Sequence, residues 1–176
     1  MHWEELFAAL EDDARGMERE TRDADIADRT RSAHARVSWL SRCVGADVAL
    51  RVREAGVVRG VVLRATPDWL LVRDRGVVDD RIVAVQAVMS VAGLSTEVAT
   101  EGGLDERLGW AHAWRVLSRD RSDVCATCVD GSVVRGVPEI VGRDYVQIRA
   151  YDGGRPTGAA PTAVPYAAIA TVTSPR

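Results

Sequence analysis

The hexapeptide Gly56-Val57-Val58-Arg59-Gly60-Val61 returns 76 positions later as Ser132-Val133-Val134-Arg135-Gly136-Val137. In both copies a glycine stands inside a run of β-branched residues, which is typical of a strand. Glycine within a strand marks a bend or bulge where a side chain would collide with a neighbour. Gly60 and Gly136 therefore predict one sharply bent strand in each half of the chain.

Three further blocks extend this match in the same order. The offset of 76 also pairs Asp47-Val48 with Asp123-Val124, and Trp69-Leu70-Leu71-Val72 with Tyr145-Val146-Gln147-Ile148. After a five-residue insertion, Ala87-Val88-Met89-Ser90-Val91 pairs with Ala168-Ile169-Ala170-Thr171-Val172. Because the only length change falls in a loop, the pattern indicates a tandem duplication.

Each copy contains five short apolar runs separated by turn residues, and Asp130-Gly131 is a strong hairpin signal. The expected strands are 47–53, 57–65, 69–74, 81–86 and 88–92 in the first copy, and 123–129, 132–141, 144–151, 164–166 and 168–172 in the second. Five short, bent strands bury little area as an open sheet. A small closed or half-closed barrel is therefore expected for each copy.

Helical periodicity precedes each copy. Leu104, Leu108, Ala111 and Trp114 recur every three or four residues, and similar stripes run over 3–17 and 26–44. The expected fold is α+β, mainly β, with N-terminal helices followed by two tandem five-stranded barrels, each preceded by a helix. The expected domains are an acidic amphipathic helix (1–25), a helix plus the first barrel (26–99) and a helix plus the second barrel (100–176).

Composition narrows the class of protein. The chain has 176 residues, 47% hydrophobic and 28% charged, and it lacks an apolar run long enough to span a membrane, so we expect a small cytoplasmic protein. All 23 cationic side chains are arginine. Arginine suits phosphate recognition, although a GC-rich genome explains the same bias. The net charge of -3 argues against strong non-specific binding of nucleic acid.

No catalytic or metal site is expected. Cys125 and Cys128 form a CxxC pair, but positions three apart in a strand point to opposite faces, and no second pair completes a zinc site. The three histidines, His2, His34 and His112, stand near no nucleophile-bearing motif, and phosphate-loop and dinucleotide-binding motifs are missing. We therefore predict a protein that is not an enzyme and uses no cofactor.

Three segments carry a resemblance to a known family: 129–136, 144–148 and 166–172. These segments resemble the Sm-like (Hfq-like) family of small β-barrels. The shared features are a preceding helix, a bent second strand after Asp-Gly and a last strand with the sequence Ala-Ile-Ala-Thr-Val. The whole layout is also similar to that of uncharacterised actinobacterial proteins. Members of the Sm-like family join edge strands into rings and bind single-stranded RNA.

The resemblance implies a binding site for single-stranded RNA. Tyr145 occupies the position where the family stacks a base on an aromatic ring, Trp69 is its partner in the first copy, and Gln147 falls where a uracil edge is recognised. Arginines at equivalent and neighbouring places would hold the RNA backbone: Arg59, Arg135 and Arg143. A simpler role for such strand arginines is to keep a sheet edge soluble.

Two other functions stay open. Tyr166 and Ala167 supply no cation where Hfq carries lysine and histidine, which favours a protein–protein assembly module that joins a second copy or a partner through barrel edges and the N-terminal helix. Residues 1–28 hold ten acids and three arginines, a charge balance that suits such a partner surface or a solvated helix face. A DNA-binding regulator is the third possibility.

Overall fold

The computed structural model describes residues 37–75, 80–96, 108–152 and 155–174. The expected helix at 1–25, most of the one at 26–44 and the start of the one at 104–118 lie outside these residues. The described part of the helix expected at 104–118 is α2 (Trp110–Arg119). Within the segment 26–44, the described residues include the short 3-10 helix η1 (Leu40–Arg42). Described residues from Trp39 onward belong to one compact unit.

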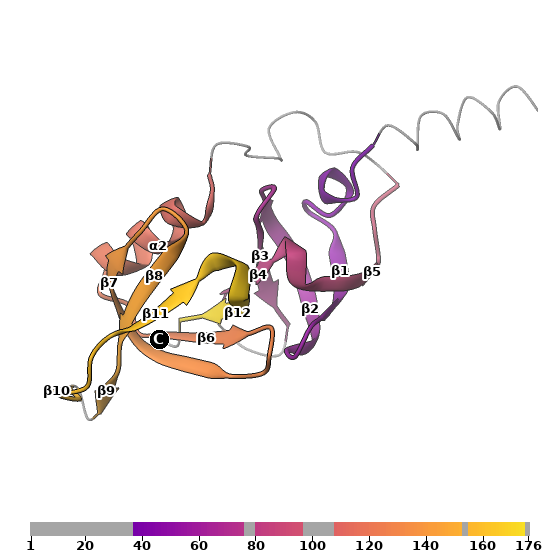
Figure 1. Ribbon diagram of the computed structural model, residues 1–176. Coiled ribbons are helices and arrows are strands. Elements are labelled where there is room, and N and C mark those ends of the chain that lie inside the picture. The colour runs from indigo at the N-terminus through magenta and orange to yellow at the C-terminus, as the bar shows by residue number, and fades with distance from the viewer. Residues whose placement is uncertain (1–36, 76–79, 97–107, 153–154, 175–176) are drawn as a thin grey trace, which may run out of the picture. The chain divides into compact units, whose positions relative to one another are not determined.

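Each half contributes five strands to the main sheet. The first half forms β1 (Asp47–Val52), β2 (Gly56–Ala65), β3 (Trp69–Asp74), β4 (Asp80–Ala84) and β5 (Val88–Ala92). The second half forms β6 (Val124–Cys128), β7 (Val133–Val141), β8 (Tyr145–Arg149), β11 (Thr162–Pro165) and β12 (Ile169–Thr173). The extra β9 (Tyr151–Asp152) and β10 (Arg155–Pro156) form a small hairpin in the longer loop of the second half (Figure 1).

The expectation of two separate Sm-like barrels is wrong. All ten main strands join one antiparallel sheet in the order β11-β8-β7-β6-β12-β4-β3-β2-β1-β5, which is not closed (Figure 1). In each half a 3-10 helix, η2 (Val85–Ala87) or η3 (Tyr166–Ala168), turns the chain between the last two strands. Those two strands therefore do not pair with each other, and β12 pairs instead with β4 of the other half.

The two halves nevertheless share their strand order and their register. Each half has the order fourth, third, second, first and fifth strand. Val48 lies opposite Gly60, and Val124 lies opposite Gly136. The second and third strands shift register after Val62 in the first half and after Pro138, its equivalent, in the second. Local sequence thus sets pairing within each half in the same way.

Gly60 confirms the predicted close approach of two strands. A Cβ atom built at this position would stand 2.0 Å from the backbone carbonyl oxygen of Arg73 on the neighbouring strand β3. No real carbon and oxygen atoms can be so close without a bond. Only glycine lets β2 and β3 approach one another here.

The core is made largely of small β-branched side chains, together with the indole rings of α2. Trp110, Ala113 and Trp114 are the buried residues of α2, and Trp114 is completely buried. This helix packs against β7 (Figure 1). Of the expected stripe, Trp114 is buried, whereas Leu108 and Ala111 are only partly buried, so the inward face is rotated toward Trp110.

Candidate functional site at the sheet edges and the junction

The junction between the halves is an antiparallel pairing of β12 with β4. Thr171 lies opposite Val83, and Val172 lies opposite Ile82. Four consecutive residues of β12, Ile169 to Val172, are each at most 3% exposed. A strand that is buried on both faces belongs to the interior of a structure. The junction is therefore a continuous part of the core.

The two ends of the sheet carry the equivalents of these junction strands. β5 in the first half corresponds to β12, and β11 in the second half corresponds to β4. Among the strands that the structure describes, each has a neighbour on one side only. Neither carries a charged residue, and Met89 on β5 is 58% exposed. Natural edge strands usually carry charges or prolines that prevent pairing, and only Pro165, the last residue of β11, fits this rule.

A cleft of about 350 Å³ lies at one end of the internal junction. Its polar and aromatic lining comes from both halves and from α2: Asp68, Gln86, Trp110, Arg143, Asp144 and Tyr166. Gln86 Nε2 donates a hydrogen bond to the Tyr166 carbonyl oxygen at 3.1 Å, which ties η2 to η3. The Trp110 and Tyr166 rings stack with centroids 6.1 Å apart.

Tyr166, which lines this cleft, is largely buried. Its hydroxyl donates to the Gly142 carbonyl oxygen at 2.9 Å, and the residue is 8% exposed. Burial raises the pKa of the Tyr166 phenol above its ordinary value, although the charge of Arg115 acts in the opposite direction. Tyr166 is thus held as a neutral structural residue of the junction. The sequence pattern did not single it out for this role.

Trp69 and Tyr145, the two aromatics expected to stack on bases, differ in exposure. Trp69 is only 5% exposed, so its indole has no open face in this structure. Tyr145 is half-buried, and its ring lies over Gly142, where a Cβ atom would be 2.3 Å from the ring carbon Cε1. Of the two, Tyr145 alone retains an accessible aromatic surface.

The polar residues of the expected RNA site are only partly brought together. Tyr145 and Gln147 alternate with buried residues on β8. Arg135 is exposed on β7, but it lies opposite Cys125 of β6, before the part of β7 that pairs with β8. Arg59 is exposed at the equivalent place on β2, but β6, β12, β4 and β3 separate its strand from β7. Arg143 lines the junction cleft. Of the expected set, Tyr145 and Gln147 are therefore neighbours on one strand, whereas Arg59 and Arg135 stand apart from them.

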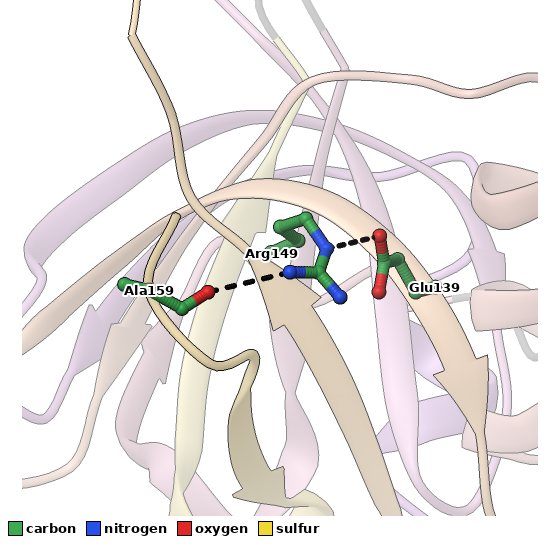
Figure 2. Close-up of polar contacts among 3 residues, drawn as sticks. All are labelled: Glu139, Arg149 and Ala159. Carbon is green, nitrogen blue, oxygen red and sulfur yellow. Dashed lines mark hydrogen bonds and ion pairs between the residues drawn. The ribbon is translucent and has the colours of Figure 1, made fainter. Parts of the chain in front are cut away.

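Arg149, the last residue of β8, has a guanidinium that already has partners (Figure 2). Nε donates to the Glu139 carboxylate, and Nη1 donates to the Ala159 carbonyl oxygen at 3.3 Å. The hydrogen bond from Arg149 lowers the pKa of Glu139 below its ordinary value. These contacts link β7 and β8 to the returning end of the loop that carries β9 and β10.

The cysteines lie as the strand pattern predicts. Cys128 is buried on β6, whereas Cys125 is half-buried on the opposite face. Cys43 is completely buried, and burial raises its pKa to about 11, partly offset by Arg42. Within the described residues, no three side chains of His, Cys, Asp or Glu are grouped so that they could hold a metal ion.

Comparisons with known proteins give no assignment. Neither a scan against protein-family models nor a search of curated proteins finds a match to this chain. The Sm-like resemblance is neither supported nor contradicted by these searches. In the part of the chain that the structure describes, no helix has both the length and the apolar character needed to cross a membrane.

Proposed function

We propose that the protein is a non-catalytic assembly module. Its chains join head to tail, with β5 of one chain pairing antiparallel with β11 of the next chain. One observation carries this proposal. The chain already makes the same kind of junction internally, between β12 and β4, which are the equivalents of β5 and β11. Strands equivalent to those that pair at the internal junction therefore lie at both ends of the sheet, where the structure describes no neighbour for them.

The internal register gives the register between copies. Thr171, Val172 and Thr173 lie opposite Val83, Ile82 and Arg81 within the chain. The same register can be applied to the equivalent residues of β5 and β11. It places Ser90, Val91 and Ala92 of one chain opposite Val164, Ala163 and Thr162 of the next chain. Each chain uses two different surfaces, its β5 edge and its β11 edge. The assembly is therefore heterologous and yields a closed ring or an open filament.

A charge-reversal experiment tests the pairing. Ala92 and Thr162 are both exposed, so substitution should leave the fold intact. The double variant Ala92→Glu/Thr162→Glu places like charges opposite each other at every junction, whereas Ala92→Glu/Thr162→Arg places opposite charges there. By light scattering we expect an oligomer for the wild type and the Glu/Arg variant, and single chains for the Glu/Glu variant. A wild type that stays a single chain at high-micromolar concentration would contradict the proposal.

A cysteine pair tests the register itself. Opposed residues in antiparallel strands have Cα atoms about 4.5–5.5 Å apart, within reach of a disulfide. Val91→Cys/Ala163→Cys should therefore form chain-to-chain disulfides on mild oxidation, seen as a ladder or a single closed band on a non-reducing gel. The control is Val57→Cys/Ala163→Cys, because Val57 is exposed on β2, away from the edge. Equal cross-linking of both variants would contradict the register.

Binding of single-stranded RNA is the second candidate, favoured by Tyr145 and Gln147, which lie two residues apart on the same face of β8. Short U-rich and A-rich oligonucleotides should give a saturable fluorescence signal that weakens at higher salt. Tyr145→Ala should reduce it by the loss of one stacking contact. No saturable signal at micromolar protein, or an unchanged Tyr145→Ala, would remove this candidate.

A further inference from the structure

Arg121 occupies a backbone position that normally belongs to glycine. Its φ is 48°, in the left-handed region that L-residues other than glycine seldom adopt. Arg121 follows Asp120, the C-cap residue of α2. The Arg121 N–H donates to the Ser118 carbonyl oxygen, and the Ser122 N–H donates to that of Leu117. This is the common termination of a helix in which the left-handed residue is usually glycine.

The first half shows what the fold requires at this place. The residue 76 positions before Arg121 is Gly45, and its φ of 75° lies in the same left-handed region. It likewise follows a short helix and precedes the first strand of its half. Glycine meets the backbone requirement there without strain. The arginine in the second half is therefore not explained by the fold alone.

The Arg121 side chain lines a pocket of about 270 Å³. The other lining residues come from the end of α2, from β7 and from β9: Ser118, Val137, Pro138, Glu139 and Tyr151. Among the described side chains, Arg121 makes no ion pair, because Glu139 is bound by Arg149 (Figure 2) and the nearby Asp120 pairs with Arg119. The pocket thus holds the guanidinium of Arg121, which is unpaired within the described residues, together with the Glu139 carboxylate, whose charge is offset by Arg149.

The polar lining is specific to the second half. At the positions of Ser118 and Glu139 the first half carries Arg42 and Leu63, and Tyr151 belongs to the hairpin in the longer loop. Three departures from the repeat, together with an arginine in a glycine position, meet at one pocket. Strained residues of this kind are enriched at ligand sites.

We propose that this pocket binds a small organic anion, a carboxylate or a phosphate ester. The Arg121 guanidinium would pair with the anionic group, the hydroxyls of Ser118 and Tyr151 can donate to it, and Val137 and Pro138 offer an apolar wall to the attached carbon skeleton. The volume suits a ligand no larger than a single ring with its acidic group. The Val116, Leu117 and Ser118 carbonyl oxygens at the end of α2 already accept turn hydrogen bonds. The full positive charge of Arg121 outweighs the partial negative charge of this helix end, which is about half an elementary charge.

The test uses phenyl phosphate and benzoate as probes, with thermal unfolding as the readout. For the wild type we expect at least one probe to raise the unfolding midpoint in a saturable way. Arg121→Gly restores the residue type of the first half, so it should unfold at an equal or higher temperature without probe, yet show no probe-dependent shift. Arg51→Gln is the matched control, since Arg51 is exposed on β1 outside the pocket.

The outcomes show which anion binds and whether Arg121 is needed for binding. A shift with phenyl phosphate alone assigns a phosphate ester, and a shift with benzoate alone assigns a carboxylate. If the wild type shows no shift with either probe, or if Arg121→Gly keeps the full shift, the proposal is overturned. Tyr151→Phe should weaken binding about threefold to tenfold by removing one hydrogen bond, and an unchanged affinity would exclude Tyr151 from the site.

Discussion

The carbonyl oxygen of Arg149 lies so close to Gly136 that a Cβ atom added there would stand 1.9 Å from it. The φ of Gly136 is 148°, which also disfavours any side chain. The same relationship holds between Gly60 and Arg73 in the first half. Each half thus depends on one glycine at the point where its second strand bends against its third.

Gly136→Ala should therefore destabilise the fold by about 3 kcal/mol or more, because the contact is with backbone, which cannot rotate away. Denaturant unfolding measures the change. Gly158→Ala is the control, since nothing lies within 4 Å of its added Cβ atom, and it should leave the unfolding midpoint nearly unchanged. Similar midpoints for Gly136→Ala and the wild type would mean that β7 and β8 are farther apart.

The sequence predicts individual strands well and their closure poorly. β3 and β5 have the expected bounds: Pro67 and Asp68 precede the apolar run of β3, and Gly93 follows that of β5. Whether β4 meets a strand of its own half or β12 of the other half is a non-local choice, which alternating hydrophobicity does not encode. Both closures bury the same apolar faces within each half, so the pattern fits either.

For the site residues too, local sequence predicts some positions, whereas others depend on non-local strand pairing. Cys125 and Cys128 lie on opposite faces because strand periodicity alone decides this. Trp69 is buried because it lies opposite Ala84, whose small side chain leaves room for the indole, whereas Tyr145 lies opposite Pro165 at the sheet edge. Arg121 could have been found from the sequence by aligning it with Gly45 after a helix, since a helix end favours glycine.

Cys43 should make stability depend on pH in the alkaline range. Burial keeps its thiol protonated in the folded protein to a pKa of about 11, whereas the unfolded thiol has a pKa of 9.0. Unfolding therefore releases a proton between these values, and stability falls by up to about 1.4 kcal/mol per pH unit as the pH rises. Below the unfolded pKa this contribution is fully present.

Comparison with Cys43→Ala isolates this contribution, because other groups such as Tyr166 titrate in both proteins. The free energy of unfolding of the wild type, minus that of the variant, should be constant at neutral pH and shrink above about pH 9. A difference that stays the same up to about pH 11 would show that Cys43 ionises in the folded state as readily as in the unfolded chain.

Loss of the Glu139–Arg149 ion pair should loosen the loop that carries β9 and β10. Glu139→Gln removes the charge that holds Arg149, whose Nη1 also binds Ala159 (Figure 2). The Thr157 N–H, which donates to the Ala150 carbonyl oxygen, should then exchange faster with solvent. Amide exchange read by mass spectrometry measures this, with the Val124 to Cys128 strand as an internal reference.

The same pair predicts an acid sensitivity. Its hydrogen bond lowers the pKa of Glu139, so the stabilisation is present above the ordinary glutamate pKa of 4.5 and is lost as the pH falls through the lower folded value. Wild type at low pH should therefore approach the loop exchange of Glu139→Gln at neutral pH, after correction for the intrinsic pH dependence of exchange. Equal protection at both pH values would contradict this coupling.

Substitutions of Trp69 distinguish between two roles for this residue, a core side chain and an exposed ring on which a base could stack. Because the side chain is 5% exposed, Trp69→Ala should cost about 3–5 kcal/mol, whereas an exposed ring would cost within about 0.5 kcal/mol. Its indole N–H has no partner among the described residues, so Trp69→Phe removes an unsatisfied donor and should cost no more than about 1.5 kcal/mol. Denaturant unfolding of both variants distinguishes the cases, and RNA-binding tests should use Tyr145→Ala, which leaves this core intact.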